Sequence, residues 1–336
     1  MNFKKLEKTW IAAEIGVNHE GSVTLAEDMI RLASKTGVDA VKFATFRINH
    51  YISTNQPERR ARIAPFELSR QAFRDLAALA KECGLTFFST PLSPDDAAFV
   101  AEIAPLIKIA SGDLNNTPVL RDVLSLGKPT IVSTGYGGAG DVRRMVETVL
   151  DVRPNAREDG SVLLMHCVGA YPTEPHDLNL RNMNWLAETF GLPVGFSDHT
   201  LGIKACELAV AAGALAVEKH FTYRKENQPW HDHAVSADPA DMRALVEAIR
   251  TAETYLGRFE RGAEHNPAET RLIDMRRSPG TVRDIPAGVP IERDWLTWLR
   301  PAWGLAADDL KSLIGRKLRH DVAAGALIMP DDLVSS

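Results

Sequence analysis

The sequence predicts a (β/α)8 barrel of the TIM type followed by a small C-terminal domain. Eight short apolar runs rich in Val, Ile, Ala and Phe occupy residues 10–222, and longer amphipathic stretches separate them. This alternation is typical of βα units whose parallel sheet is buried on both faces. Nearly every run ends in polar or ionisable residues. Because barrel enzymes place their chemistry at the C-terminal ends of the strands, we expect an enzyme.

The strands and helices are expected in strict alternation. The eight runs are residues 10–16, 38–46, 85–91, 106–112, 129–135, 162–168, 193–200 and 216–222. Helical periodicity lies between them, for example at residues 24–35, 69–83, 141–150 and 203–212. Residues 238–241 (DPAD) carry the signals of a helix start, and a helix from there to about Tyr255 would close the barrel as its eighth.

The pattern changes near Met275, which indicates a second domain. We expect a catalytic barrel over residues 1–260, a polar linker over 261–274 and a C-terminal domain over 275–336. The last segment reads as short strands and turns with one brief helix near residues 306–313. A core of this size is marginal alone, so docking on the barrel or on another subunit would stabilise it.

Bulk composition argues against several classes of partner and location. The 336 residues carry a net charge of −5, which gives no reason to expect binding to nucleic acid. Cys83, Cys167 and Cys206 are widely spaced, and Cys167 reads as a reduced core thiol rather than a nucleophile. The N-terminus lacks a secretory core and no long apolar run follows. We therefore expect a cytoplasmic protein with no membrane partner.

The last two strands bring together two histidines. Side chains alternate along a strand, so Ser197 and His199 share one face of the seventh, and Glu218 and His220 share one face of the eighth. Two histidines at adjacent strand ends with carboxylates nearby form half of a divalent-metal site. The alternative is that each histidine only forms hydrogen bonds within the core.

Two lysines stand inside otherwise apolar runs. Lys42 and Lys108 would be costly to bury without an anionic partner. One interpretation is a buried ion pair with Glu14 or Glu218. The other is a pocket for a phosphate or carboxylate, assisted by the hydroxyls of nearby strand ends.

Several motifs, in this order, resemble the sialic acid synthase (nonulosonic acid synthase) family. In the barrel they are AEIGVNHEG (13–21), DAVKFATF (39–46), IKIASGD (107–113), STG (133–135), HCVGAYPT (166–173), GFSDHT (195–200), EKHFT (218–222) and DHAVS (232–236). RDIPAG (283–288) and LRP (299–301) resemble the family's antifreeze-protein-like (SAF) domain. The resemblance covers essentially the whole chain. It implies a transferase that condenses phosphoenolpyruvate with an aldehyde sugar, commonly N-acetylmannosamine or a diacetamido-trideoxyhexose, to give a 3-deoxy-2-keto nonulosonic acid.

The resemblance also implies roles for individual residues. His199 and His220 would hold a divalent metal, expected to be Mn²⁺, and Arg300 would reach the partner subunit's active site in a domain-swapped homodimer. The catalytic residues, which handle water, sugar hydroxyls and proton transfer, would be Glu14, Glu218 and Asp232. The residues expected to bind substrate are Lys42, Thr90, Lys108, Ser111, Ser133, Tyr171 and Ser197.

The match weakens around the acceptor sugar. Ala44 stands where relatives usually carry Gln, and Gly169 where many carry Asn or Ser. The stretch between Phe46 and Ser69 looks short, and Trp230 and His231 are inserted ahead of Asp232. We therefore expect an acceptor other than N-acetylmannosamine. The rivals are a metal-dependent barrel hydrolase, for which His231-Asp232-His233 has a suitable HxH spacing, and an inactive sugar-phosphate binder.

Overall fold

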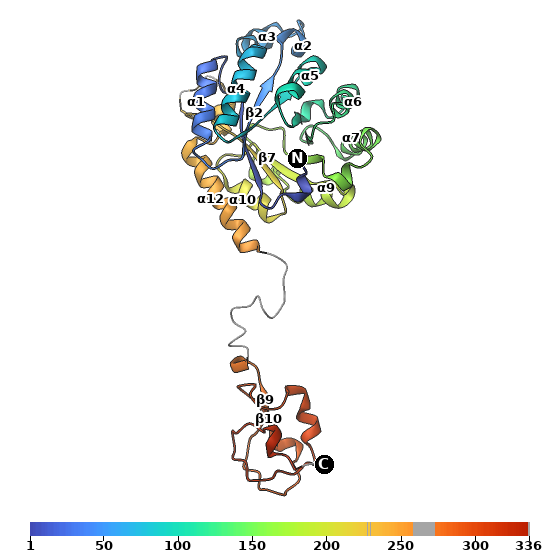
Figure 1. The fold of residues 1–336 in the computed structure, drawn as a ribbon, viewed down its shortest axis with the longest axis vertical. Coiled ribbons are helices and arrows are strands. Elements are labelled where there is room, and N and C mark those ends of the chain that lie inside the picture. The colour runs from blue at the N-terminus through green and yellow to red at the C-terminus, as the bar shows by residue number, and fades with distance from the viewer. Residues whose placement is uncertain (227, 229, 258–272, 335–336) are drawn as a thin grey trace. The chain divides into compact units, whose positions relative to one another are not determined.

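The computed structural model describes residues 1–226, 228, 230–257 and 273–334, in two compact units that divide between Gly257 and Arg258 (Figure 1). The first unit is the barrel, and the second is the C-terminal domain. Of the linker expected over 261–274, residues 261–272 lie outside the described residues.

Eight parallel strands close the barrel in sequence order, as the eight apolar runs predict. The strands are β1 (Trp10–Gly16), β2 (Ala40–Thr45), β3 (Thr86–Pro91), β4 (Ile107–Ile109), β5 (Thr130–Ser133), β6 (Val162–His166), β7 (Val194–Asp198) and β8 (Ala216–His220). The closing pair is β1 with β8, which sets Glu14 beside His220. Glu14 is also in register with Lys42 of β2, and Ser197 with Glu218 of β8.

The helices surround the strands and bury their apolar faces against them (Figure 1). Those that follow the strands are α1 (Val23–Ala33), α4 (Arg70–Glu82), α5 (Pro94–Ile103), α6 (Thr117–Ser125), α7 (Ala139–Val152), α9 (Asn182–Phe190), α10 (Lys204–Ala211) and α12 (Pro239–Leu256). The final helix is confirmed where DPAD predicts it. Asp238 is its N-cap, and its carboxylate accepts hydrogen bonds from the backbone N–H groups of Ala240 and Asp241.

The barrel interior has an apolar lower half and a polar upper half. Phe3 of η1 (Phe3–Lys5) belongs to a buried cluster with inward side chains such as Trp10, Phe88 and Met165. This layer closes the N-terminal end of the barrel. The polar strand ends therefore lie above a packed floor, where a ligand can enter from one end only.

Short helices that the sequence pattern did not predict follow β2. They are α2 (Ile48–Tyr51), α3 (Pro57–Ile63) and η2 (Ala64–Phe66), with α8 (Ala156–Asp159), η3 (Ser111–Asp113), η4 (Pro175–Asp177) and α11 (Asp232–Val235) elsewhere in the barrel unit. Phe46, Ile52 and Ile63 form a small buried cluster here, separate from the main core. Residues of this segment also line the cavity at the C-terminal ends of the strands.

The C-terminal unit consists mainly of short strands and turns, as expected. The strands β9 (Ser278–Thr281) and β10 (Leu296–Leu299) pair antiparallel, and 3₁₀ turns form η6 (Arg293–Trp295), η7 (Ala307–Leu313) and η8 (Pro330–Asp332). The brief helix expected at 306–313 is η7. Leu296, Leu310, Leu318 and Ile328 belong to the unit's own small core. Across the described residues of both units, every helix is too short or too polar to cross a bilayer.

Candidate active site

A cavity of about 230 Å³ opens at the C-terminal ends of the barrel strands. Twelve of the thirteen side chains singled out from the sequence line it: Glu14, Lys42, Thr90, Lys108, Ser111, Ser133, Tyr171, Ser197, His199, Glu218, His220 and Asp232. The thirteenth, Arg300, directly follows β10 and belongs to the C-terminal unit. The register of the parallel strands explains why these side chains lie together. At the C-terminal ends of the strands, the side chains that point into the barrel meet at one rim.

A charged cluster forms the floor of the cavity, defined here as Glu14, Lys42, Lys108 and Glu218. The Lys42 Nζ atom lies 3.0 Å from Glu14 Oε2 and 3.5 Å from Glu218 Oε1, and the Lys108 Nζ atom lies 2.8 Å from Glu218 Oε2. All four side chains are buried. The ion pairing left open by the sequence is therefore present, and the same lysines face the cavity.

The two glutamates of the floor differ in their protonation. Burial raises the pKa of Glu14 to about 7, against the attraction of Lys42, and repulsion from Glu218 adds to the rise. Burial also disfavours the charged form of Glu218, but Lys108 and Lys42 outweigh it and hold its pKa below the usual value. Ser197 Oγ donates a 2.9 Å hydrogen bond to the same carboxylate. Glu218 is therefore ionised at neutral pH, whereas Glu14 is close to half-protonated.

The pKa values of the two lysines shift in opposite directions. Burial lowers the pKa of Lys108, and the neighbouring Lys42 adds to this despite the pull of Glu218. For Lys42, Glu14 and Glu218 together outweigh burial, so its pKa is raised. Thr90 accepts a 3.3 Å hydrogen bond from the Lys42 ammonium. With both lysines charged and Glu218 ionised, the floor carries one net positive charge whenever Glu14 holds its proton.

The histidine pair stands next to this floor. The His199 and His220 ring centroids are 5.5 Å apart, and Tyr171 stacks on His199 at 4.0 Å. The His199 Nδ1 atom lies 2.7 Å from the carbonyl oxygen of Val168, so it donates a proton and leaves the Nε2 lone pair free. The His220 Nδ1 atom is buried and has no hydrogen-bond partner among the described residues.

These two rings fit a divalent metal. Burial lowers the pKa of both, that of His220 to about 3, so each is a neutral imidazole at physiological pH, the form that ligates metals. Within the described ranges no group of three or more His, Cys, Asp or Glu side chains is arranged around one metal position. A metal held by this pair would take its remaining ligands from water or substrate.

The cavity also has an apolar wall that the sequence largely failed to predict. It consists of Val17, Ala44, Phe46, Tyr51, Ile63, Phe66, Leu92 and Trp230. Ala44 lies in β2, and the others come from the segments after β1, β2, β3 and β8, including α2, α3 and η2. The signals in the sequence were the departures at Ala44 and Trp230 and the short stretch between Phe46 and Ser69.

Trp230 occupies a distinctive place in this wall. Its ring meets Phe66 edge-on at 5.1 Å between centroids, and the Arg62 guanidinium lies 5.7 Å above it. The indole Nε1–H is buried without an acceptor among the described residues. A buried donor without a partner is costly, and a ligand carbonyl or hydroxyl could satisfy it.

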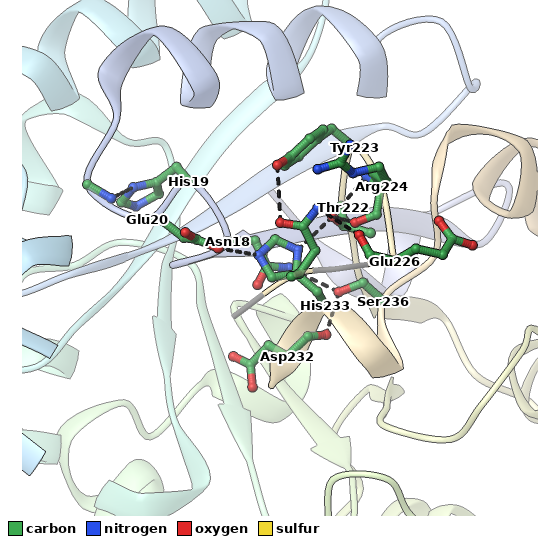
Figure 2. Close-up of polar contacts among 12 residues, drawn as sticks. Asn18, His19, Glu20, Thr222, Tyr223, Arg224, Glu226, Asp232, His233 and Ser236 are labelled. Carbon is green, nitrogen blue, oxygen red and sulfur yellow. Dashed lines mark hydrogen bonds and ion pairs between the residues drawn. The ribbon is translucent and has the colours of Figure 1, made fainter. Parts of the chain in front are cut away.

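The structure also accounts for two other departures noted in the sequence. A Cβ atom on Gly169 would lie 2.3 Å from the Tyr136 ring, so that ring fills the space that a larger residue would need. His231 and His233 do not act as an HxH pair. The His231 side chain is 58% exposed, whereas the His233 side chain is buried against Thr222 and Glu20 (Figure 2). This removes the main argument for a barrel hydrolase.

Comparison with known proteins identifies two family models and several similar proteins. The NeuB family model matches residues 29–261 and the SAF domain model matches residues 281–334. The N,N'-diacetyllegionaminic acid synthases of Legionella pneumophila and Campylobacter jejuni are 37% and 32% identical, covering 95% and 93% of this chain and 93% and 96% of their own lengths. Among solved structures, the N-acetylneuraminic acid synthetase of Leptospira borgpetersenii in complex with citrate is 29% identical, with a TM-score of 0.74 over 80% of this chain and 91% of its own.

Proposed function

Since this chain belongs to the NeuB family, we propose that it condenses phosphoenolpyruvate with an uncharged diacetamido-trideoxyhexose in its open-chain aldehyde form. The enzyme is a nonulosonic acid synthase, a transferase that forms a carbon–carbon bond and releases phosphate. The proposal concerns the acceptor sugar and the roles of the side chains.

The observation that carries the acceptor proposal is the division of the cavity into a lysine floor and an apolar wall. Among the described residues that line the cavity, the only Lys or Arg side chains are Lys42 and Lys108, both paired with glutamates on the floor. A sugar phosphate at the wall would therefore have no cation in the cavity lining itself, because Arg62, over the Trp230 ring, and Arg59, beside Tyr51, lie outside that lining. Methyl groups of acetamido substituents and of a deoxygenated C6 would instead be buried against Ile63, Phe66 and Trp230.

Phosphoenolpyruvate is anionic and fits the floor. Lys42 and Lys108 would offset the charge of its carboxylate and phosphate, while the hydroxyls of Thr90, Ser111, Ser133 and Ser197 orient it. Glu218, ionised and held by three hydrogen bonds from Lys108 and Ser197, would fix the lysines rather than carry a proton. Tyr171 would close the side of the site next to the histidines.

The two remaining carboxylates of the site are Glu14, proposed to transfer protons, and Asp232, proposed to orient the sugar. The C3 carbon of phosphoenolpyruvate attacks the aldehyde carbon, water adds at C2, and phosphate leaves from the tetrahedral carbon. Glu14, with a pKa of about 7 and protonated when phosphoenolpyruvate binds, can give its proton to the aldehyde oxygen and then accept one from the attacking water. Asp232, which also lines the cavity, would orient the sugar hydroxyls. A divalent metal, proposed to be Mn²⁺, held by His199 and His220 would act as a Lewis acid toward the aldehyde carbonyl.

A substrate panel tests the acceptor proposal. Phosphate release and product mass are measured with phosphoenolpyruvate and Mn²⁺ for 2,4-diacetamido-2,4,6-trideoxyhexoses, N-acetylmannosamine and N-acetylmannosamine 6-phosphate. We expect the diacetamido sugars to give the highest kcat/KM, by about tenfold or more, as a few buried methyl groups would provide. A higher value for the phosphorylated sugar would overturn the proposal.

Arg300 is proposed to complete the site of a partner subunit in a domain-swapped homodimer. The support is the NeuB–SAF domain order together with the small separate core of the C-terminal unit. Co-expressed Arg300→Ala and Lys42→Ala chains should regain part of the activity that each variant lacks alone, because a mixed dimer can hold one site with both residues intact. No recovery in purified mixed dimers would mean that Arg300 acts within its own chain or not at all.

A further inference from the structure

The one-turn helix α11 (Asp232–Val235) cannot hold its position by itself. It begins directly after His231, and isolated helices of a single turn are unstable in water. Nevertheless, Asp232 at its start and Trp230 just before it both line the cavity. Contacts from outside the helix must therefore fix the positions of these two side chains.

The first such contact is made by His233, whose side chain is fully buried (Figure 2). Its Nδ1 atom lies 2.7 Å from Thr222 Oγ1, directly after β8, and its Nε2 atom lies 3.1 Å from Glu20 Oε1, in the loop after β1. The Thr222 hydroxyl donates its only proton to the carbonyl oxygen of Arg224, at 2.8 Å. The His233 ring thus bridges Thr222 and Glu20, with its Nε2 atom facing the carboxylate.

The His233 Nε2 atom lies within hydrogen-bond distance of Glu20 Oε1 and can donate its proton to that carboxylate. A hydrogen bond to a carboxylate is charge-assisted and therefore stronger than one between neutral groups. It joins α11 to the loop after β1, more than 200 residues away in the sequence.

A second contact fixes the other end of α11 to the same loop. Ser236 Oγ donates a 2.7 Å hydrogen bond to the carbonyl oxygen of Asp232, so it accepts the 3.0 Å bond from Asn18 Nδ2. The same Asn18 amide donates to the carbonyl oxygen of Phe221 at 2.9 Å. Asn18 is fully buried, so these bonds compete little with water.

The loop after β1 is itself packed tightly against the segment that carries the apolar wall. Gly21 has a φ of +81°, and a Cβ atom there would lie 2.0 Å from the carbonyl oxygen of Pro65 in η2. Only glycine fits this approach. The anchoring loop therefore has little freedom to move relative to the cavity.

We propose that His233 is a positioning residue for the condensation, which together with Glu20 holds α11 so that Asp232 and Trp230 face the acceptor sugar. We refer to the Glu20–His233–Thr222 chain of contacts as the latch. The inference rests on the proposed role of Asp232 but not on the identity of the sugar. The latch residues follow β1 and β8 and do not line the cavity, whereas all four residues of the lysine floor do. Breaking it should affect the acceptor and leave phosphoenolpyruvate in place.

The kinetic test compares Glu20→Ala, Glu20→Gln and His233→Phe in the full-length enzyme. Glu20→Ala and His233→Phe should lower kcat/KM for the acceptor by about 10- to 100-fold, as misplacement of a positioned group by about 1 Å does. Their Kd for phosphoenolpyruvate, measured by calorimetry, should stay within about threefold of the parent enzyme. Glu20→Gln should recover most of the loss, because its amide can donate to or accept from the imidazole.

The control is Glu82→Ala, which removes an exposed carboxylate at the end of α4 remote from the cavity. Parent-like acceptor kinetics in Glu20→Ala, or an equal loss in phosphoenolpyruvate affinity, would overturn the proposal. So would a Glu20→Gln variant as impaired as Glu20→Ala.

Hydrogen exchange supplies a readout that does not depend on turnover. Amides of residues 230–236 should exchange faster in Glu20→Ala than in Glu82→Ala, with the barrel strands unchanged. Unchanged exchange in this segment would show that Glu20 does not hold α11. An Asp232→Ala variant tests the role of Asp232 separately from the latch. Full turnover of this variant would refute the role of Asp232. The exchange data would still decide whether the latch holds α11.

Discussion

The floor and the apolar wall of one cavity are built in different ways. The floor consists of charged side chains on strands, whose relative positions follow from the register of the closed barrel. The wall consists of apolar side chains on loops and on helices of one or two turns, held by local contacts such as Phe66 with Trp230. The proposed phosphoenolpyruvate site thus depends on the frame of the fold, whereas the proposed acceptor site consists largely of segments that can change without disturbing that frame.

The two regions should also differ in how severely they respond to mutation. Removing one charge from the floor leaves its partner buried and uncompensated, at a cost of about 3 to 5 kcal/mol. Removing a side chain from the wall loses apolar contact at a partly open surface. Substitutions near the floor should therefore affect chemistry broadly, and substitutions in the wall should affect only the acceptor.

The largest effect is expected for His220→Ala, next to the floor. The variant should lose bound metal and reduce turnover by roughly three orders of magnitude or more, because a polarised carbonyl is worth several kcal/mol. Metal content by mass spectrometry and phosphate release measure the two consequences, with circular dichroism as the check on folding. His176→Ala, which changes an exposed histidine, is the matched control. Near-normal turnover of the variant, or of the parent enzyme after thorough chelation, would refute a metal-assisted mechanism.

Next in size is Trp230→Ala in the wall. Loss of the ring contact and of the unpaired Nε1–H should lower kcat/KM for the acceptor by about 10- to 100-fold. This corresponds to a loss of roughly 1 to 3 kcal/mol of binding free energy. The Kd for phosphoenolpyruvate should not change. Trp230→Phe keeps an aromatic ring without the N–H, so an intermediate value would measure the hydrogen bond alone. If phosphoenolpyruvate binding fell equally, the separation of floor from wall would be wrong.

The sequence predicted the floor much better than the wall, for a physical reason. Period-two alternation assigns Lys42, Glu218 and His220 to the barrel interior, and closure of the barrel brings them together. Residues 47–66 form helices too short to produce a hydrophobic period, so Tyr51, Ile63 and Phe66 gave no signal. Which lysine pairs with which glutamate depends on side-chain conformation, and the sequence left it open.

The same limit applies to protonation. Glu14 and Glu218 are both glutamates at strand ends, and nothing in their sequence context distinguishes them. The difference arises because two lysines contact Glu218 while Glu14 has only one at close range. The latch was equally hidden, since Glu20 and His233 lie far apart in the chain and meet only through closure of β1 with β8.

A smaller effect within the floor concerns pH. Glu14 has a pKa of about 7, raised from 4.5, so it holds its proton below that value and loses it above. Loss of the proton takes the floor from one net positive charge to none, which should weaken binding of phosphoenolpyruvate by up to about tenfold per pH unit. Calorimetry in buffers of different ionisation enthalpy should show proton uptake on binding near pH 8.

Glu14→Gln is the control for this effect. The amide cannot titrate, so the variant should lose the part of the proton uptake that Glu14 provides and keep the part that belongs to the ligand's own phosphate. Identical proton uptake in the two proteins would mean that Glu14 does not change its protonation state when phosphoenolpyruvate binds.

The smallest expected effect is at Ala44, where the floor and the wall meet. Ala44 lies two residues beyond Lys42 on the same strand face, in register with Thr90, and borders the cavity. Ala44→Gln would add a donor and an acceptor for a sugar hydroxyl or amide. It should move the ratio of kcat/KM values toward N-acetylmannosamine by about 3- to 10-fold, the effect of one modest hydrogen bond in a partly open site. Ala44→Met has nearly the same length without the amide, so an equal shift in that variant would attribute the effect to volume. If neither variant changes the ratio, the residues that select the acceptor lie entirely in the loops that carry Ile63, Phe66 and Trp230.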